Sequence, residues 1–280
     1  MTGRNLKIAS TGLIGILLLA LFYPTLKWLL GEWLGNDYYS HGPLVPLISA
    51  FLAWRLWIKW LPEQRRIKPA TIGLLPLGAG LIVYLYALLQ RAYFAASLAM
   101  IIIIAGLVWY LLGTAALRRF AFPIGFLVFM IPLPFIEPLS VPLAQLTGAM
   151  SAAIVRLLGV PIAVNGAQIS LPNAELVVGA QCSGLRSIVT LMTLVALVIF
   201  LVEGAWWKKL LLALSSIVIA ALGNVVRVAS LLVVANIWGA DAAFKYYHDY
   251  SGIVFFLSAL ALLLSFSWML GCREIRDDIF

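Results

Sequence analysis

Long apolar runs recur along almost the whole of this chain, each separated from the next by a short polar stretch. The runs occupy residues 8–30, 42–60, 71–89, 93–112, 119–136, 183–202, 209–236 and 249–270. A helix needs about 20 apolar residues to cross the hydrocarbon core of a bilayer, where the backbone must satisfy its hydrogen bonds internally. We therefore expect an all-α polytopic membrane protein with about eight transmembrane helices.

Composition argues against a water-soluble protein. The chain is 64% hydrophobic and only 11% charged, whereas a soluble domain is roughly half apolar. Its 280 residues leave little length outside these runs, so we predict a single membrane-embedded domain over 1–280. The first run is too long for the core of a signal peptide and is expected to remain as a span.

The basic residues indicate the topology. Clusters of them lie at Arg4 and Lys7, then Arg65, Arg66 and Lys68, then Arg118 and Arg119, then Lys208 and Lys209, and finally Arg273 and Arg276. Every second connection is therefore basic, and the net charge of +8 indicates membrane topology rather than a nucleic-acid partner. By the positive-inside rule, both termini are cytoplasmic. The segments 31–41, 137–182 and 239–249 then lie on the outer side, with only Arg156 against this assignment.

The outer segment 137–182 has two parts. Up to about Leu158 it is moderately apolar, which fits either an interfacial helix or a short re-entrant pair. From Ile162 to Val178 apolar and polar residues alternate around two turn signals, Asn165-Gly166 and Pro172-Asn173. This pattern predicts a small extracytoplasmic strand meander that leads directly into Cys182.

Cys182 is the first candidate for chemistry, because it stands at the outer mouth of the helix expected from Ser183. The N–H groups and partial positive charge of a helix N-terminus lower the pKa of a thiol, and Arg186 is expected to add to this effect. The alternative is a buried cysteine that acts as a small apolar residue. Cys272 is expected about a bilayer thickness away, too far for a disulfide, so Cys182 is predicted to be a lone thiol.

Arg227 interrupts the seventh apolar run. An arginine inside a span costs several kcal/mol unless it faces water or a partner. Counting from Lys209 at about 1.5 Å per residue places Arg227 near the outer boundary, level with Cys182. Its side chain either reaches the outer headgroups or, with Asn224 one turn earlier and Gly223 beside it, faces into the bundle.

Two histidines are predicted on the outer side. His248 begins the last span, next to Asp249, and imidazole is the usual proton shuttle near neutral pH. Because tyrosines flank it, His248 also fits a simple role in the interfacial aromatic belt. His41 is a competing base, and Ser183 is a weaker nucleophile candidate than Cys182. Too few clustered ligands are present for zinc, so we expect no metal and no other cofactor.

Three motifs in order resemble the exosortase and archaeosortase family, and bacterial exosortases in particular. They are CSG at 182–184, which includes Gly184, then GNVVR at 223–227 and HDYSG at 248–252. The SHGPLVP stretch at 40–46 and the expected eight-helix layout are similar as well, so the resemblance spans most of the chain. Gly179 departs from the family pattern, where alanine is expected three residues before the cysteine.

The resemblance implies a membrane cysteine protease or transpeptidase in the bacterial inner membrane. Its substrates would be surface proteins with a C-terminal signal: a short motif, often Pro-Glu-Pro, then an apolar helix and a basic tail. Cys182 would be the nucleophile that forms a thioester, Arg227 the transition-state stabiliser, and His248 the acid and base. Family members often accompany exopolysaccharide production.

Two other functions remain open from the sequence. A transporter could use Arg227 to line a pathway for an anionic substrate, although the chain has no inverted repeat and few intramembrane charges. A non-catalytic assembly subunit of an exopolysaccharide export system is the other alternative. The expected partners are membrane lipid and, for a protease, its protein substrates, whereas the oligomeric state is not indicated.

Overall fold

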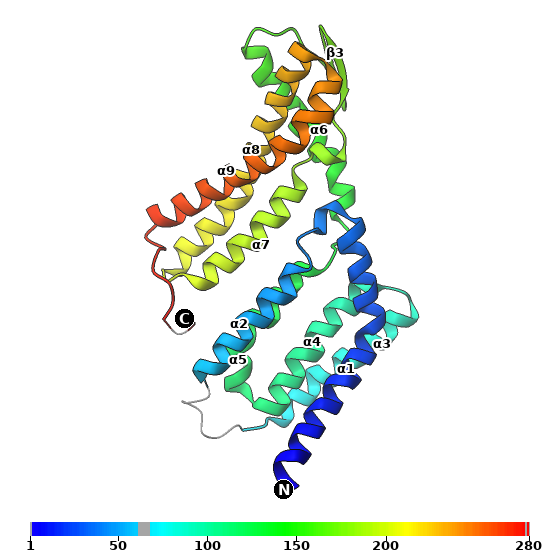
Figure 1. Ribbon diagram of the computed structural model, residues 1–280, viewed down its shortest axis with the longest axis vertical. Coiled ribbons are helices and arrows are strands. Elements are labelled where there is room, and N and C mark those ends of the chain that lie inside the picture. The colour runs from blue at the N-terminus through cyan, green and yellow to red at the C-terminus, as the bar shows by residue number, and fades with distance from the viewer. Residues whose placement is uncertain (1, 61–67, 278, 280) are drawn as a thin grey trace. The chain divides into compact units, whose positions relative to one another are not determined.

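The computed structural model describes residues 2–60, 68–277 and 279, and helices dominate it (Figure 1). Within the described chain, six helices are long and apolar enough to cross a membrane. The prediction of a polytopic α-helical membrane protein is therefore confirmed. The chain divides into two compact units, Met1–Pro132 and Leu133–Phe280. Arg65 and Arg66, which contribute to the predicted topology, lie outside the described residues.

The first unit contains five α-helices. These are α1 (Thr2–Gly35), α2 (Leu44–Trp60), α3 (Leu74–Leu89), α4 (Tyr93–Leu112) and α5 (Thr114–Phe126), with short 3₁₀ turns η1 (Asp37–Tyr39), η2 (Thr71–Gly73) and η3 (Leu127–Met130). The helices α3 and α4 approach closely because glycines lie in their interface. A Cβ at Gly106 would lie 2.6 Å from the backbone nitrogen of Leu77, so only glycine permits this packing.

Polar side chains link helices inside this apolar unit. The Thr25 hydroxyl on α1 lies 2.9 Å from the Tyr84 hydroxyl on α3, and the Tyr84 hydroxyl donates to the Leu21 carbonyl at 2.8 Å. Ser49 on α2 likewise donates to the Pro123 carbonyl of α5 at 2.6 Å. Such bonds satisfy groups that would otherwise be costly to bury in an apolar environment.

The second unit combines helices with a small sheet. Its elements are α6 (Ile136–Leu157), β1 (Ala163–Asn165), β2 (Gln168–Leu171), β3 (Ala174–Val177), the 3₁₀ turn η4 (Ala180–Cys182), α7 (Leu185–Leu201), α8 (Trp206–Trp238), the π-helix η5 (Ala242–Tyr247) and α9 (His248–Met269). The helices α7, α8 and α9 pack side by side around buried apolar residues such as Leu191, Leu212 and Leu263 (Figure 1).

The helix α8 has two halves with different neighbours. From Trp206 to Asn224 it is about 27 Å long at 1.5 Å per residue, which is close to the thickness of the hydrocarbon core, and this half packs on α7 and α9. Beyond Asn224 it packs mainly on α6, the sheet and η5, while Arg227 still reaches the start of α9. The change of neighbours places Asn224 at the end of the three-helix bundle.

The predicted strand meander is confirmed. The antiparallel sheet has the order β1-β2-β3 and pairs Val164 with Ile169 and Ile169 with Leu176. Ile169 and Leu176 are buried against the second half of α8. The chain then passes from β3 through Val178 and Gly179 into η4, which ends at Cys182.

The structure corrects two of the predicted segments and decides between the alternatives for a third. The run 119–136 is not one helix: Gly113, with φ of 90°, separates α4 from a helix that already starts at Thr114. This helix ends before Pro132 and Pro134, which lack the backbone N–H that a helix requires. The first part of 137–182 is one continuous helix, α6, rather than a re-entrant pair. The outer segment 239–249 is mostly helical, because η5 continues directly into α9.

Candidate active site

Cys182 is held by a tight turn at the entrance to α7. Its backbone N–H donates to the Gly179 carbonyl at 2.9 Å, and the Ser183 N–H donates to the Ala180 carbonyl at 3.1 Å. The Ser183 hydroxyl accepts from the Leu185 N–H at 3.3 Å, across Gly184 at the start of α7. Ser183 therefore has a local structural role at this position.

Gly184 is the hinge between this turn and α7. Its φ of 77° is in the left-handed region, which costs other residues about 1–2 kcal/mol. A Cβ at this position would also lie 2.7 Å from the side-chain carbon of Asn224. Both observations require glycine in the third position of the CSG motif.

Asn224 connects α8 to the cysteine turn. Its Nδ2 donates to the Cys182 carbonyl at 2.8 Å, and its side chain is only 4% exposed. The Oδ1 atom of Asn224 has no hydrogen-bond partner within the described chain. A buried acceptor of this kind calls for a donor, which a water molecule or a bound ligand can supply.

Arg227 lies one turn further along α8 and binds the start of α9. Its Nη2 donates to the His248 carbonyl at 3.0 Å and lies 3.3 Å from His248 Nε2, while its Nε donates to the Ser251 hydroxyl at 3.3 Å. A guanidinium has only donors. The contact with Nε2 is therefore a hydrogen bond only when that nitrogen is unprotonated.

A further pair of hydroxyls supports Arg227. The Tyr247 hydroxyl donates to the Ser230 hydroxyl at 2.8 Å, and Ser230 donates to the Arg227 carbonyl at 2.6 Å. Sequence reasoning did not select Ser230, Tyr247 or Ser251. Helical spacing contained a signal for two of them, because Ser230 and Ser251 each follow a candidate residue by three positions.

Burial and charge act on the Cys182 thiol in opposite directions. The side chain is only 2% exposed, and this burial raises the pKa of the thiol; the positive charge of Arg227 and the hydrogen bond with the Gly179 backbone oppose the rise. The expectation that the pKa of the Cys182 thiol is lowered overall is therefore wrong. Arg186 is exposed on α7, and burial of Cys182 outweighs the effects that lower its pKa.

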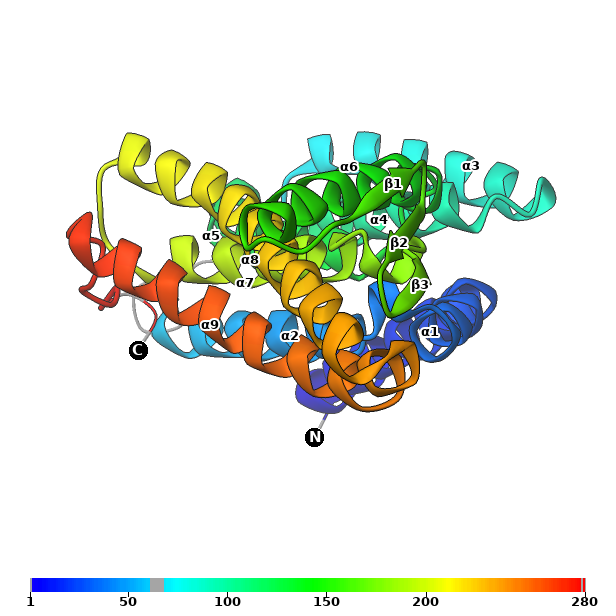
Figure 2. The same ribbon diagram turned by 90° about the horizontal axis from the view of Figure 1, so that it is seen from above.

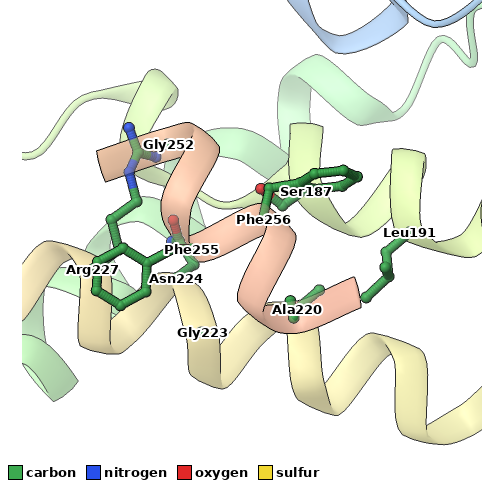
Figure 3. Close-up of a pocket in the computed structure, with 10 residues that line it drawn as sticks. Ser187, Leu191, Ala220, Gly223, Asn224, Arg227, Gly252, Phe255 and Phe256 are labelled. Atoms are coloured by element: carbon green, nitrogen blue, oxygen red, sulfur yellow. The ribbon is translucent and has the colours of Figure 1, made fainter. Parts of the chain in front are cut away.

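A small cavity of about 10 Å³, lined by Asn224, Arg227 and Gly252, lies between α7, α8 and α9 (Figure 3). This volume matches roughly one water-sized sphere. Figure 3 shows Asn224 and Arg227 projecting from α8 beside the segment of α9 that contains Gly252. A polar group in this cavity would thus lie beside both the amide of Asn224 and the guanidinium of Arg227.

His41 and Cys272 are held by other elements. His41 belongs to the first unit, where its ring stacks on Tyr39 with centroids 6.1 Å apart. Burial lowers the pKa of His41, and a hydrogen bond with the Phe129 backbone opposes this shift. Cys272 follows α9 at the opposite end of the bundle from Cys182, and both thiols are free and buried. Among the described residues, no group of three His, Cys, Asp or Glu side chains could hold a metal ion.

The structure therefore joins the three sequence motifs in one network. The CSG turn contacts Asn224, and Arg227 in the same motif contacts His248 and Ser251. Arg227 is also near enough for its charge to act on the Cys182 thiol, as the residue count from Lys209 predicted. A family model described as transmembrane exosortase, of the EpsH type, matches residues 33–265 and includes all three motifs.

The chain belongs to the transmembrane exosortase family. The resemblance seen in the sequence is thereby confirmed. With several apolar helices, this exosortase-family chain is a multi-pass membrane protein. Searches of the curated proteins and of the solved structures found no match.

Proposed function

We propose that this exosortase-family protein is a membrane cysteine protease or transpeptidase. It would cleave surface proteins at a C-terminal sorting signal consisting of a short motif such as Pro-Glu-Pro, an apolar helix and a basic tail. The observation that carries the proposal is the network from the Cys182 backbone through Asn224 and Arg227 to His248. It supplies a thiol, a guanidinium and an imidazole at one end of an apolar helix bundle.

The first step needs a base, because burial favours the protonated form of Cys182. His248 is the proposed base, and its Nε2 lies 3.3 Å from Nη2 of Arg227 in the present arrangement. When Arg227 turns to the carbonyl oxygen of a substrate, Nε2 is released to accept the thiol proton. Substrate binding and base activation are thereby coupled.

The reaction then follows the pattern of nucleophilic acyl transfer. Sγ of Cys182 attacks the carbonyl carbon as its proton passes to His248, and Arg227 stabilises the developing oxyanion. When the tetrahedral intermediate collapses, the C–N bond breaks and His248 returns the proton to the leaving amine. The thioester on Cys182 is released by an acceptor amine or by water.

The depth of the site suits a substrate with its own transmembrane helix. The α7–α9 bundle spans about 27 Å up to Asn224, so an apolar substrate helix lying beside it in the lipid would end near Cys182. We place this end on the extracytoplasmic side of the bacterial inner membrane, with both termini of the chain in the cytoplasm. The basic tail of the substrate would then remain at the cytoplasmic surface.

Cys182→Ala and Cys272→Ala form the matched pair that tests this proposal. Both remove a buried free thiol from the same unit, at opposite ends of the bundle. Each variant is co-expressed with a reporter that ends in a cognate signal, and cleavage is followed by the size of the reporter. We expect Cys182→Ala to abolish cleavage, by roughly 10³-fold or more, and Cys272→Ala to retain it.

A thioester gives a second readout that separates catalysis from transport or assembly. In the wild type, a hydroxylamine-sensitive adduct with the reporter should form at Cys182, and Cys182→Ser should lose both this thioester and the cleavage. A transporter or an assembly subunit would tolerate Cys182→Ser. Cleavage that persists in Cys182→Ala would end the proposal.

A further inference from the structure

The sheet before Cys182 has two edges with different neighbours. Its strand order makes β1 and β3 the two edge strands. The strand β1 lies beside α6 (Figure 2), and Arg156 of α6 donates to the carbonyl of Ile162 just before it, at 3.0 Å. The strand β3 is on the opposite side of β2, and it leads to the candidate nucleophile.

The backbone groups of β3 that point outward follow from its pairing with β2. The Val178 N–H donates to the Ala167 carbonyl at 2.8 Å, so Val178 faces β2. Because the direction of N–H and C=O groups alternates along a strand, those of Val177 and Glu175 point to the open edge. Both residues are exposed, Val177 by 62%, and within the described chain no backbone group pairs with this edge.

The chain direction of β3 and its position near Cys182 suit its open edge to bind a peptide that is cleaved at Cys182. Val177 and Cys182 are five positions apart, at most about 17 Å of extended chain. The chain runs from β3 toward the bundle, since η4 and α7 follow it. A substrate that descends from the outer side into an apolar helix runs in the same direction.

We propose that the segment of the substrate just before its scissile bond adds to β3 as a fourth, parallel strand. The proposal rests on the proposed protease function and names the recognition surface of that site. Val177 and Glu175 would supply two backbone donors and two acceptors, which bind an extended peptide whatever its side chains. Specificity would come from the side chains beside the new strand, and the register would present one carbonyl to Cys182.

Proline substitutions test this strand addition directly. Val177→Pro removes the outward N–H and leaves the pairing with β2 intact, because Val177 does not donate to β2. Proline is tolerated on an edge strand, and the preceding Leu176 already has the extended backbone that proline demands. Val177→Ala is the matched control, since it shortens the side chain and keeps the N–H. Glu175→Pro and Glu175→Ala form a second pair at the other outward position.

The measurement is steady-state cleavage of a purified reporter that carries the signal, in lipid nanodiscs. One lost hydrogen bond of about 1 kcal/mol corresponds to a roughly fivefold rise in KM. We expect this rise for each proline variant, with kcat nearly unchanged, and about 25-fold for the double proline variant. Both alanine variants should stay within about twofold of the wild type, because they retain the backbone donors.

A small probe separates loss of strand addition from misfolding and from failure of the protease function. Alkylation of Cys182 by iodoacetamide, in a Cys272→Ala background, needs no peptide bound at β3 but does report the packing around Cys182. Each proline variant used must therefore match the wild-type rate. Proline variants that match this rate and also keep the KM of their alanine controls would overturn strand addition, with the protease function intact. If wild type and Cys182→Ala process the reporter equally, the protease function fails, and strand addition at this site fails with it.

Discussion

The two ends of the α7–α9 bundle are built from similar parts but differ in what surrounds them. Each end has a free cysteine that is 2% exposed, and a side chain that is 4% exposed donates to its carbonyl at 2.8 Å. Asn224 holds Cys182 and Ser267 holds Cys272. Each cysteine also lies close to a glycine with positive φ, Gly184 at 77° and Gly271 at 75°.

The difference lies in the polar groups beyond this shared frame. At the Cys272 end, backbone pairing closes the structure: the Glu203 N–H donates to the Glu274 carbonyl at 2.8 Å, and the Arg276 N–H donates to the Leu201 carbonyl at 2.9 Å. At the Cys182 end, Arg227 and His248 contact each other through side chains, beside a small cavity. The Cys182 end therefore adds a guanidinium, an imidazole and a small cavity to the frame that both ends share. The proposed chemistry is assigned to this end for that reason.

After loss of the nucleophile itself, the largest expected effect comes from removing Arg227. Under the proposed mechanism, Arg227→Ala loses the group that stabilises the oxyanion, so kcat should fall about 10²–10³-fold. Arg227→Lys keeps the charge but not the planar fork of donors, and should recover only part of the activity. Reporter cleavage by purified protein measures both.

Arg276→Ala is the control at the other end of the bundle. Arg276 donates to the Phe200 carbonyl at 3.4 Å and lies over the Phe200 ring at 5.0 Å, so it is also a partly buried arginine with an aromatic neighbour. We expect its loss to change kcat by less than about threefold, since surface contacts of this kind contribute little. Equal losses for the two alanine variants would mean that Arg227 acts through general stability.

Much of this comparison could be predicted from the sequence. Apolar runs identified the helices because span length is a physical requirement of the bilayer, and α4 has the bounds that were expected, 93–112. Turn residues identified the strand meander for a similarly local reason. Counting residues along α8 brought Arg227 level with Cys182, because the rise of a helix is constant.

The features that the sequence did not predict depend on tertiary packing. Cys182 is buried because the sheet, α6 and α8 pack together around it. No local sequence pattern indicates this burial. The thiol pKa was therefore predicted in the wrong direction. The bond between Asn224 and the Cys182 carbonyl likewise joins residues 42 positions apart. The predicted boundaries of α5 were wrong because hydropathy disfavours a span at Arg118 and Arg119, whereas the backbone there is helical.

The next largest effect is expected from Gly184→Ala, which should lower the stability of the fold. A left-handed backbone costs alanine about 1–2 kcal/mol, and the contact with Asn224 adds about 1–3 kcal/mol of overpacking. Gly271→Ala pays only the backbone cost, because a Cβ there would meet only Lys208 Nζ, at an ordinary 3.5 Å. In detergent, the melting temperature of Gly184→Ala should therefore be lower than that of Gly271→Ala. Equal melting temperatures would mean that the Asn224 contact is not tight.

Asn224→Ala and Ser267→Ala test the shared part of the two ends. Each variant leaves a buried cysteine carbonyl without its partner, which costs about 1–3 kcal/mol. We expect similar losses of stability from the two variants, measured by melting. Only Asn224→Ala should also slow cleavage, because it releases the turn that carries the nucleophile. A comparable loss of activity in Ser267→Ala would show that the two ends are not functionally distinct.

The smallest expected effect is on the pH dependence of alkylation at Cys182. Because burial raises the pKa of this thiol, its alkylation by iodoacetamide in a Cys272→Ala background should reach half its limiting rate above the pH of an ordinary thiol. Arg227→Ala removes the charge that opposes the rise, so this midpoint should move to still higher pH, whereas Arg276→Ala should leave it in place. A midpoint below that of an ordinary thiol would instead mean a preformed thiolate. His248 would then not be needed to deprotonate the nucleophile, and its role would be confined to protonating the leaving amine.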